Sequence, residues 1–366
     1  MVEHTAGVNV VTPSEAMHKL RSVRPFTIKP RTADGVVSIN NEFGQPIVVV
    51  TGASGFIGQH VCAALWEAGW NVRPVVRNQQ PTTLRGAWLI RDMEEACAFD
   101  AALAGATALV HLAGLAHVLH EQDAPQEFQA SNVRLTEVVI RAAATHRIQT
   151  VVFMSSAAVS MAYDRNSVGD RSMYAETKQR AEEVVSRIGA DNGIHTWILR
   201  PPLVYGPGMK GNPLRLFKLI ARAIPLPLGR IHNKRSFLYV KNLAAAVVAA
   251  LECPERGGTY HITDWPAMST EEFVHRVADA LGVRLRLFAV PSGALNAIGM
   301  IGDTLRLIGV RVPSSSDIRR LTSSYELDGE VFRLATGYKP SVSLSDALEE
   351  TAIWFTGSAG DAIGSG

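Results

Sequence analysis

The stretch VVVTGASGFIGQH, residues 48–60, joins a continuous apolar run to three glycines at three-residue intervals. The apolar run, residues 46–51, is typical of a strand that is buried on both faces of a parallel sheet. Gly52, Gly55 and Gly58 suit a tight turn, close approach of the backbone to a pyrophosphate, and close packing of a helix on the strand. The free N–H groups at the start of that helix favour a phosphate. The stretch predicts a dinucleotide-binding turn; the alternative is a glycine-rich turn without a ligand.

Outward from this turn, short β-rich runs alternate with helical segments. Strands are predicted at 46–51, 71–76, 87–90, 107–114, 149–156 and 194–202, and helices at about 56–69, 94–104, 127–146 and 172–190. This alternation is typical of a parallel sheet that helices cover on both faces. The sequence therefore predicts an α/β fold with a Rossmann-type, doubly wound parallel sheet.

The pattern changes after Tyr205. Irregular Gly- and Pro-rich stretches come first, and they predict a smaller, mainly C-terminal α/β lobe for the substrate. Its helices are expected at about 270–281, 293–308 and 343–355. We expect a poorly ordered extension at 1–45, a dinucleotide-binding domain at 46–205 plus about 236–263, a substrate lobe at 206–235 and 264–356, and a flexible tail at 357–366.

Composition argues against several classes of protein. Charged residues make up 19% of the chain, and the net charge of +2 comes from interspersed signs, whereas nucleic-acid binding needs a clustered basic face. No stretch approaches the roughly 18 apolar residues of a membrane helix, and the N-terminus has no signal-peptide pattern. Cys62, Cys97 and Cys253 are sparse and fit no metal-ligand spacing. We expect a cytoplasmic protein with no metal, no nucleic-acid partner and no stable membrane insertion.

The end of the second strand bears on which dinucleotide is bound. In the usual NAD arrangement an acidic residue there binds the ribose hydroxyls, about 20 residues after the glycines. Here the strand is followed by Arg77, which could hold a 2′-phosphate or could be a solvated side chain. We therefore favour NADP over NAD. Asp92 and Met93 follow the third strand and could reach the adenine, or Asp92 could cap the next helix.

Nicotinamide chemistry needs a group that moves a proton beside the hydride. Tyr174 and Lys178 are four residues apart, which places them on one face of a helix. A tyrosine has an ordinary pKa of about 10, and a neighbouring lysine favours the phenolate. Ser155 and Ser156 end a strand, where open α/β sheets bind ligands, and can supply a hydroxyl for the substrate oxygen. The alternative for the Tyr174–Lys178 pair is an exposed helix face.

These motifs together resemble the extended short-chain dehydrogenase/reductases that act on nucleotide sugars, the NAD-dependent epimerase/dehydratase family. The matching segments are TGASGFIG (51–58), HLAG (111–114), SSAAV (155–159), YAETK (174–178), LRPPLVYGPG (199–208) and RSFLYVKNL (235–243). The resemblance covers roughly residues 46–356 and implies that Ser156 is the catalytic hydroxyl, Tyr174 the acid/base and Lys178 its partner. It implies cofactor contacts at Tyr174, Lys178, Phe56, Ile57, Leu112, Ala113, Gly114 and Pro201.

The resemblance also narrows the reaction. Nucleotide-sugar 4,6-dehydratases carry an Asp-Glu pair after the catalytic hydroxyl, whereas this chain has Ala157 and Ala158. The C-terminal half is similar to bacterial reductases of UDP-4-keto-6-deoxy-N-acetylhexosamines, which make N-acetylquinovosamine-type donors for surface polysaccharide. That similarity implies an NAD(P)-dependent reductase of the C4 keto group of a UDP-6-deoxy-N-acetylhexosulose. A UDP-sugar 4-epimerase is the alternative, and a 3β-hydroxysteroid-type alcohol dehydrogenase is a further one.

A UDP-sugar brings a diphosphate that arginines can bind. Arg235 matches the family arginine that contacts this group, and its alternative is a surface residue beside Lys234. Arg320, with Arg319, is a weaker candidate for a second contact. Asn212 could touch the sugar or shape its turn. The resemblance implies a homodimer formed through the helices at about 127–146 and 172–190.

Two further polar residues receive a structural interpretation. His111 lies at the end of the predicted 107–114 strand, near the expected cofactor path, and Asn132 matches a family helix asparagine. For both, a role in holding the fold is preferred to one in catalysis.

Overall fold

The computed structural model describes residues 45–77, 84, 86–91, 93–115, 125–161, 172–229, 231–254, 256–264, 266–307, 315, 318 and 322–363. Residues 45–366 form one compact unit, to which every described residue belongs. The extension expected at 1–45 lies, apart from Gln45, outside the described residues.

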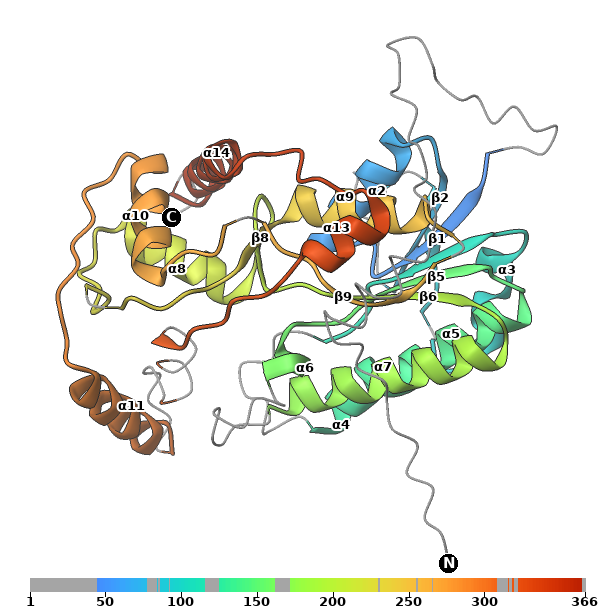
Figure 1. The fold of residues 1–366 in the computed structure, drawn as a ribbon, viewed down its shortest axis with the longest axis horizontal. Helices are drawn as coiled ribbons and strands as arrows, with labels where there is room; N and C mark the ends of the chain where they lie inside the picture. Colours follow the sequence, from blue (N-terminus) through green and yellow to red (C-terminus); the bar gives the residue numbers. More distant parts are fainter. Residues whose placement is uncertain are drawn as a thin grey trace, which may run out of the picture. The chain divides into compact units, whose positions relative to one another are not determined.

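A parallel sheet of seven strands forms the centre of the unit (Figure 1). In spatial order the strands are β3 (Trp88–Leu89), β2 (Asn71–Val76), β1 (Ile47–Thr51), β4 (Ala108–His111), β5 (Thr150–Met154), β6 (His195–Arg200) and β9 (Gly258–His261). Strand order reverses between β1 and β4, which is where ligands bind in open α/β sheets. The predicted α/β fold with a Rossmann-type parallel sheet is confirmed.

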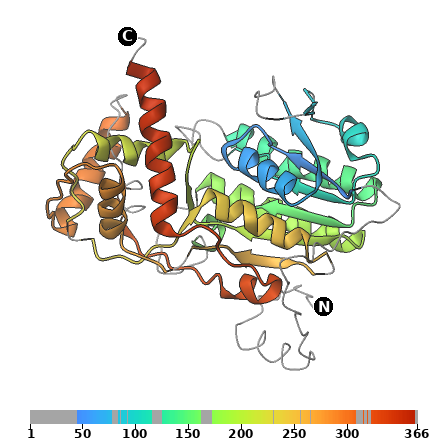
Figure 2. The same ribbon diagram turned by 90° about the horizontal axis from the view of Figure 1, so that it is seen from above.

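Helices cover both faces of the sheet (Figures 1 and 2). One face carries α2 (Phe56–Glu67) and α9 (Val240–Leu251), which pack against each other, and the other carries α5 (Leu135–Thr145) and α7 (Met173–Asp191). The remaining helices on this half are η1 (Ala96–Phe99), α3 (Asp100–Leu103), α4 (Pro125–Phe128), η3 (Gln129–Arg134) and α6 (Ala158–Met161).

The central strands are mostly apolar because helices cover both faces of the sheet. Val48 and Val50 belong to the core cluster under α2 and α9, whereas Val49 belongs to the cluster under α5 and α7. All three side chains are fully buried. This alternation between two cores explains why the glycine turn follows an uninterrupted apolar run.

The C-terminal part has a core of its own, which includes Phe217, Phe273 and Phe355. It comprises β7 (Leu203–Tyr205) paired with β8 (Phe237–Tyr239), and the helices α8 (Gly211–Ala221), α10 (Thr270–Ala280), α11 (Ser292–Leu307) and α14 (Leu344–Ile363). Helix α13 (Glu330–Thr336) packs on β9 instead and contributes Phe332 to the core under α2 and α9. Since the chain from 45 to 366 is one compact unit, its division into a dinucleotide domain and a substrate lobe is a proposal.

Two local expectations differ from the structure. A flexible tail was expected at 357–366, but α14 continues to Ile363. Once a helix is packed through Leu348 and Phe355, extending it adds a hydrogen bond per residue without a new nucleus. The strand expected at 87–90 is only Trp88–Leu89, at the sheet edge, with Leu89 46% exposed. Within the described part of the chain, no helix combines the length and apolarity needed to cross a membrane.

Candidate active site

The glycine turn packs against the end of β4 without room for side chains. Gly52 has φ +71°, and a Cβ there would lie 2.7 Å from the backbone nitrogen of Ala113. A Cβ on Gly58 would lie 2.2 Å from the carbonyl oxygen of Gly52. Both positions therefore require glycine, one for its backbone conformation and both for the close approach of neighbouring backbone.

The helix that follows this turn is open to an anion. Gly55 is the N-cap of α2, no side chain caps the helix, and its first turn holds no acidic residue. The N–H groups at its start, on Phe56, Ile57 and Gly58, belong to the positive end of the helix dipole. These features fit the pyrophosphate of a dinucleotide.

Most of the remaining predicted cofactor residues follow the C-terminal ends of the parallel strands, as the glycine turn does. Arg77 is exposed directly after β2, Leu112 and Ala113 follow β4, and Pro201 follows β6. Met93 packs against the core under α5, which accounts for it without a ligand. Asp92 lies outside the described residues.

Ser156 lies just beyond the C-terminal end of β5. Its half-buried Oγ accepts a hydrogen bond of 3.2 Å from the backbone N–H of Ala158. The neighbouring Ser155 is buried and donates its hydroxyl proton to Glu182. The two serines thus differ, because the Ser155 hydroxyl is buried and bonded to Glu182, whereas Ser156 is partly exposed.

Helix α7 carries Tyr174 in its first turn, because the Ser172 hydroxyl caps the helix by accepting from Ala175 N–H at 3.2 Å. Tyr174 is half-buried, whereas Lys178 is only 5% exposed. The Lys178 ammonium donates to the Met154 carbonyl at 2.9 Å. Burial lowers the pKa of Lys178 to about 8, an effect that Glu182 opposes.

Gly114 and Asn132 both lie close to the Lys178 ammonium. A Cβ on Gly114 would lie 3.2 Å from Lys178 Nζ and 2.8 Å from Asn132 Oδ1. Asn132 is fully buried and holds the Leu115 backbone, accepting from its N–H at 2.7 Å. The glycine that ends HLAG is therefore part of the same site as the lysine of YAETK.

His111 is fully buried between two hydroxyls. Its Nδ1 lies 2.6 Å from Thr51 Oγ1, and its Nε2 lies 3.0 Å from Thr136 Oγ1. Since Thr136 gives its own proton to the Asn132 carbonyl, we assign the imidazole proton to Nε2. Burial lowers the pKa of His111 to about 3, so the ring is neutral near pH 7. Its contacts tie β1, β4 and α5 together, in agreement with the structural interpretation.

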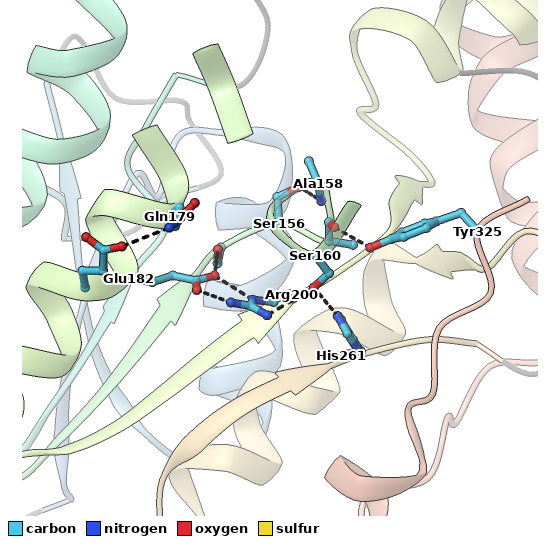
Figure 3. A network of polar contacts seen from close by, with 11 residues as sticks. Ser156, Ala158, Ser160, Gln179, Glu182, Arg200, His261 and Tyr325 are labelled. Atoms are coloured by element: carbon cyan, nitrogen blue, oxygen red, sulfur yellow. Dashed lines mark hydrogen bonds and ion pairs between the residues drawn. The ribbon is translucent and has the colours of Figure 1, made fainter. Parts of the chain in front are cut away.

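A buried polar network lies behind Ser156 (Figure 3). Arg200 on β6 donates to both carboxylate oxygens of Glu182 and also to Ser160 Oγ, at 3.1 Å. Ser160 lies 2.8 Å from the Nε2 atom of His261. Burial, then the Arg200 charge, lower the pKa of His261 to about 4. Sequence reasoning missed this network, although Glu182 follows Lys178 by one helical turn.

Tyr325 joins this network from the C-terminal part of the chain (Figure 3). Its hydroxyl donates to the carbonyl of Ala157, the residue after Ser156. Its backbone N–H donates to the Lys234 carbonyl at 2.6 Å, and its carbonyl accepts from Ser236 N–H at 3.0 Å. Tyr325 thus lies between the backbone of the Arg235 segment and the Ser156 loop, and no sequence signal predicts it.

Arg235 is half-buried in this segment. Its backbone exchanges hydrogen bonds with Met268, at 2.8 and 3.0 Å. Burial lowers the pKa of the guanidinium, and no carboxylate among the described residues pairs with it. Asn212 is exposed in the first turn of α8, and Arg319 and Arg320 lie outside the described residues.

Relatives of this chain include epimerases and reductases. A UDP-glucose 4-epimerase from Vibrio cholerae is 26% identical, over 84% of this chain and 95% of its own length. A 2-alkyl-3-oxoalkanoate reductase from Stenotrophomonas maltophilia is 28% identical, over 82% of this chain and 97% of its own. The solved structure of MoeE5 in complex with UDP-glucuronic acid and NAD has a TM-score of 0.65 at 23% identity, covering 85% of this chain and 99% of MoeE5.

The model of one protein family matches residues 48–263, from the glycine turn to just past β9. The match includes Ser156, Tyr174, Lys178 and Arg235. Because the matched range, residues 48–263, amounts to more than half of the 366-residue chain, the chain belongs to the NAD dependent epimerase/dehydratase family.

Proposed function

We propose that this protein is an NAD(P)-dependent reductase of the C4 keto group of a UDP-6-deoxy-N-acetylhexosulose, which supplies a sugar donor for surface polysaccharide. The observation that carries the proposal is the link through Tyr325 between the Ser156 loop and a half-buried Arg235 that pairs with no carboxylate among the described residues. A buried guanidinium without a carboxylate partner favours an anionic ligand, and a nucleotide diphosphate accepts its forked donors. The backbone on either side of Arg235 is bonded to Tyr325, whose hydroxyl is bonded to the residue after Ser156, and this connection supports a diphosphate contact near the proposed catalytic hydroxyl.

Bound NAD(P) supplies the hydride, and the residues of the chain supply the proton and the orientation. Ser156 Oγ holds the keto oxygen, and Tyr174 donates the proton that this oxygen needs as it becomes an alcohol. Lys178 holds a positive charge one turn away on α7, which makes the phenol more acidic. Lys178 and the neighbouring Gly114 also suit contact with the nicotinamide ribose, because the glycine leaves that side of the ammonium uncovered.

The loop after Ser156 supports hydride transfer to a ketone without elimination of water. Ala157 and Ala158 carry no group that can move a proton, and the Ala157 backbone is bonded on both sides, to Pro201 and to Tyr325. For the cofactor we propose NADP over NAD, because exposed Arg77 follows β2 where an acidic residue would bind ribose hydroxyls.

The first test mixes purified protein with NADPH and UDP-4-keto-6-deoxy-N-acetylglucosamine and follows nicotinamide absorbance. Stoichiometric loss of NADPH supports the reductase. If NADPH persists while UDP-galactose or UDP-N-acetylgalactosamine is converted into its C4 epimer in a parallel tube, the protein is a 4-epimerase, the activity named for its Vibrio cholerae relative.

A second candidate function is reduction of a ketone on an apolar substrate, as in the reductase named among the relatives. The exposed apolar side chains of α11 favour it, since Met300 is 68% and Ile301 59% exposed. Arg235 separates the two functions. An Arg235→Ala variant that keeps full substrate affinity removes the main support for a nucleotide sugar.

A further inference from the structure

The face of α7 that carries Tyr174 and Lys178 continues to Glu182, one further turn along the helix. Glu182 is 6% exposed, and its carboxylate binds both Arg200 and the Ser155 hydroxyl. Lys178 is bonded to the carbonyl of Met154, the residue before Ser155. Two successive residues of the β5 end are thus attached to two successive turns of α7, and Ser156 follows directly.

We propose that Glu182 is a positioning residue for the active site: its carboxylate fixes the Ser156 loop to α7 and holds Lys178 in its charged form. This inference rests on the proposed function, in which Ser156 and Lys178 act together. No role is implied for Glu182 in contact with substrate or cofactor, since both of its oxygens are engaged by the protein.

The charge of Glu182 acts on a lysine in a protein interior. Lys178 is buried, and this burial is the largest influence lowering its pKa, to about 8, while the Glu182 carboxylate raises it. A buried ammonium without an opposite charge nearby loses its proton more readily. The Glu182 carboxylate also forms an ion pair with the Arg200 guanidinium, which connects α7 with β6.

Other groups around Lys178 do not replace this charge. Among the described residues of the packed elements, β4 contributes neutral His111, η3 the Asn132 amide, and β5 the Phe153 ring, 4.9 Å from the ammonium. Helix α6 contributes the Ser160 hydroxyl, which is bonded to Arg200. Tyr174 is the remaining titratable group on the same face of α7. Glu182 is therefore the nearby anion in this set.

The test compares Glu182→Gln with Glu183→Gln. Glu183 is the next residue of α7, is exposed, and accepts a bond of 3.1 Å from Gln179, so the control loses the same charge outside the network. The readout is the affinity for NADPH or NADH, by nicotinamide fluorescence, from about pH 6.5 to about pH 8. It needs no knowledge of the sugar.

For wild type and E183Q we expect affinity to fall about twofold over this range, as half of Lys178 loses its proton near pH 8. For E182Q we expect a fall of about fivefold or more, because Lys178 then titrates at lower pH. An E182Q profile that superimposes on those of wild type and E183Q overturns the inference.

Removing one member of a buried ion pair can prevent folding, and thermal melting detects this. The double variant Glu182→Gln with Arg200→Met removes both charges of this ion pair, so that neither Glu182 nor Arg200 leaves an unpaired partner behind. It should show the same steep pH dependence as E182Q, and a profile like wild type overturns the inference too. A different result would contradict the proposed function alone. In that case wild type binds the cofactor with the expected pH dependence but does not oxidise NADPH with the keto sugar.

Discussion

The Tyr325 hydroxyl donates a hydrogen bond to the carbonyl of Ala157, the residue that follows Ser156. These two residues are 168 positions apart in the sequence. The same tyrosine pairs through its backbone with Lys234 and Ser236, on either side of Arg235. A single residue therefore connects the backbone around the proposed diphosphate contact with the proposed catalytic loop.

Replacing Tyr325 by phenylalanine keeps the ring and removes this hydrogen bond. We expect kcat to fall about five- to tenfold with KM nearly unchanged, because the loop loses an anchor worth about 1 kcal/mol. Steady-state kinetics and melting check this. Tyr260→Phe is the control, since its hydroxyl donates to the carbonyl of Gly257, the residue before β9. Unchanged kcat in Y325F would show that the bond does not position Ser156.

Replacing Tyr174 by phenylalanine should reduce turnover by at least about 100-fold, because the proton donor is lost. Affinity for NADPH should stay within about twofold, since the ring remains in place. The measurement pairs a turnover assay with a fluorescence titration. Full activity in Y174F contradicts the mechanism.

Replacing Arg235 by glutamine should weaken the binding of UDP by about 10- to 100-fold, as expected for loss of a charged hydrogen-bonded contact. Lys234→Gln is the matched control, because Lys234 is exposed and pairs with Glu326 at 3.7 Å. Isothermal titration with UDP alone measures both. Equal UDP affinity in R235Q and wild type argues for a substrate without a diphosphate.

Replacing Gly58 by alanine forces a Cβ to within 2.2 Å of the Gly52 carbonyl oxygen. The start of α2 must then shift away from the pyrophosphate position, so we expect at least a tenfold loss of NADPH affinity and a lower melting temperature. Gly293→Ala in α11, where a Cβ meets no atom within 4 Å, should change neither. Wild-type cofactor affinity in G58A contradicts the assigned binding site.

The reductase should also lose activity in alkali. Burial lowers the pKa of Lys178 from 10.5 to about 8, so the cation that supports Tyr174 is present below this pH and is lost as pH rises through it. The profile of kcat/KM should therefore fall above about pH 8, as a property of the coupled Tyr174–Lys178 pair. A profile that stays flat to about pH 10 is incompatible with a catalytic Lys178 cation.

The sheet, the glycine turn and the Tyr174–Lys178 pair could be predicted because each produces a pattern within a short stretch of sequence. Val48, Val49 and Val50 are buried in two different cores, which produces an unbroken apolar run, and the glycines follow from close backbone contacts. The spacing of Tyr174 and Lys178 is a property of one helix. These features need no knowledge of distant parts of the chain.

The rest of the site depends on contacts between distant segments. Arg200 and Glu182 look like ordinary surface residues in sequence, and only the packing of α7 on β6 makes them a partly buried pair. Tyr325 reaches Ala157 because its segment pairs with Lys234 and Ser236. Neither periodicity nor spacing encodes such pairings, since they arise from tertiary structure.

The most direct test of the central claim follows the hydride itself. The protein is incubated with NADPH that carries deuterium on the transferred face and with UDP-4-keto-6-deoxy-N-acetylglucosamine, and the product sugar is examined by mass spectrometry and NMR. We predict one deuterium, bound to C4, for each NADPH consumed. A product without deuterium at C4, or an unchanged keto sugar beside intact NADPH, would contradict the account.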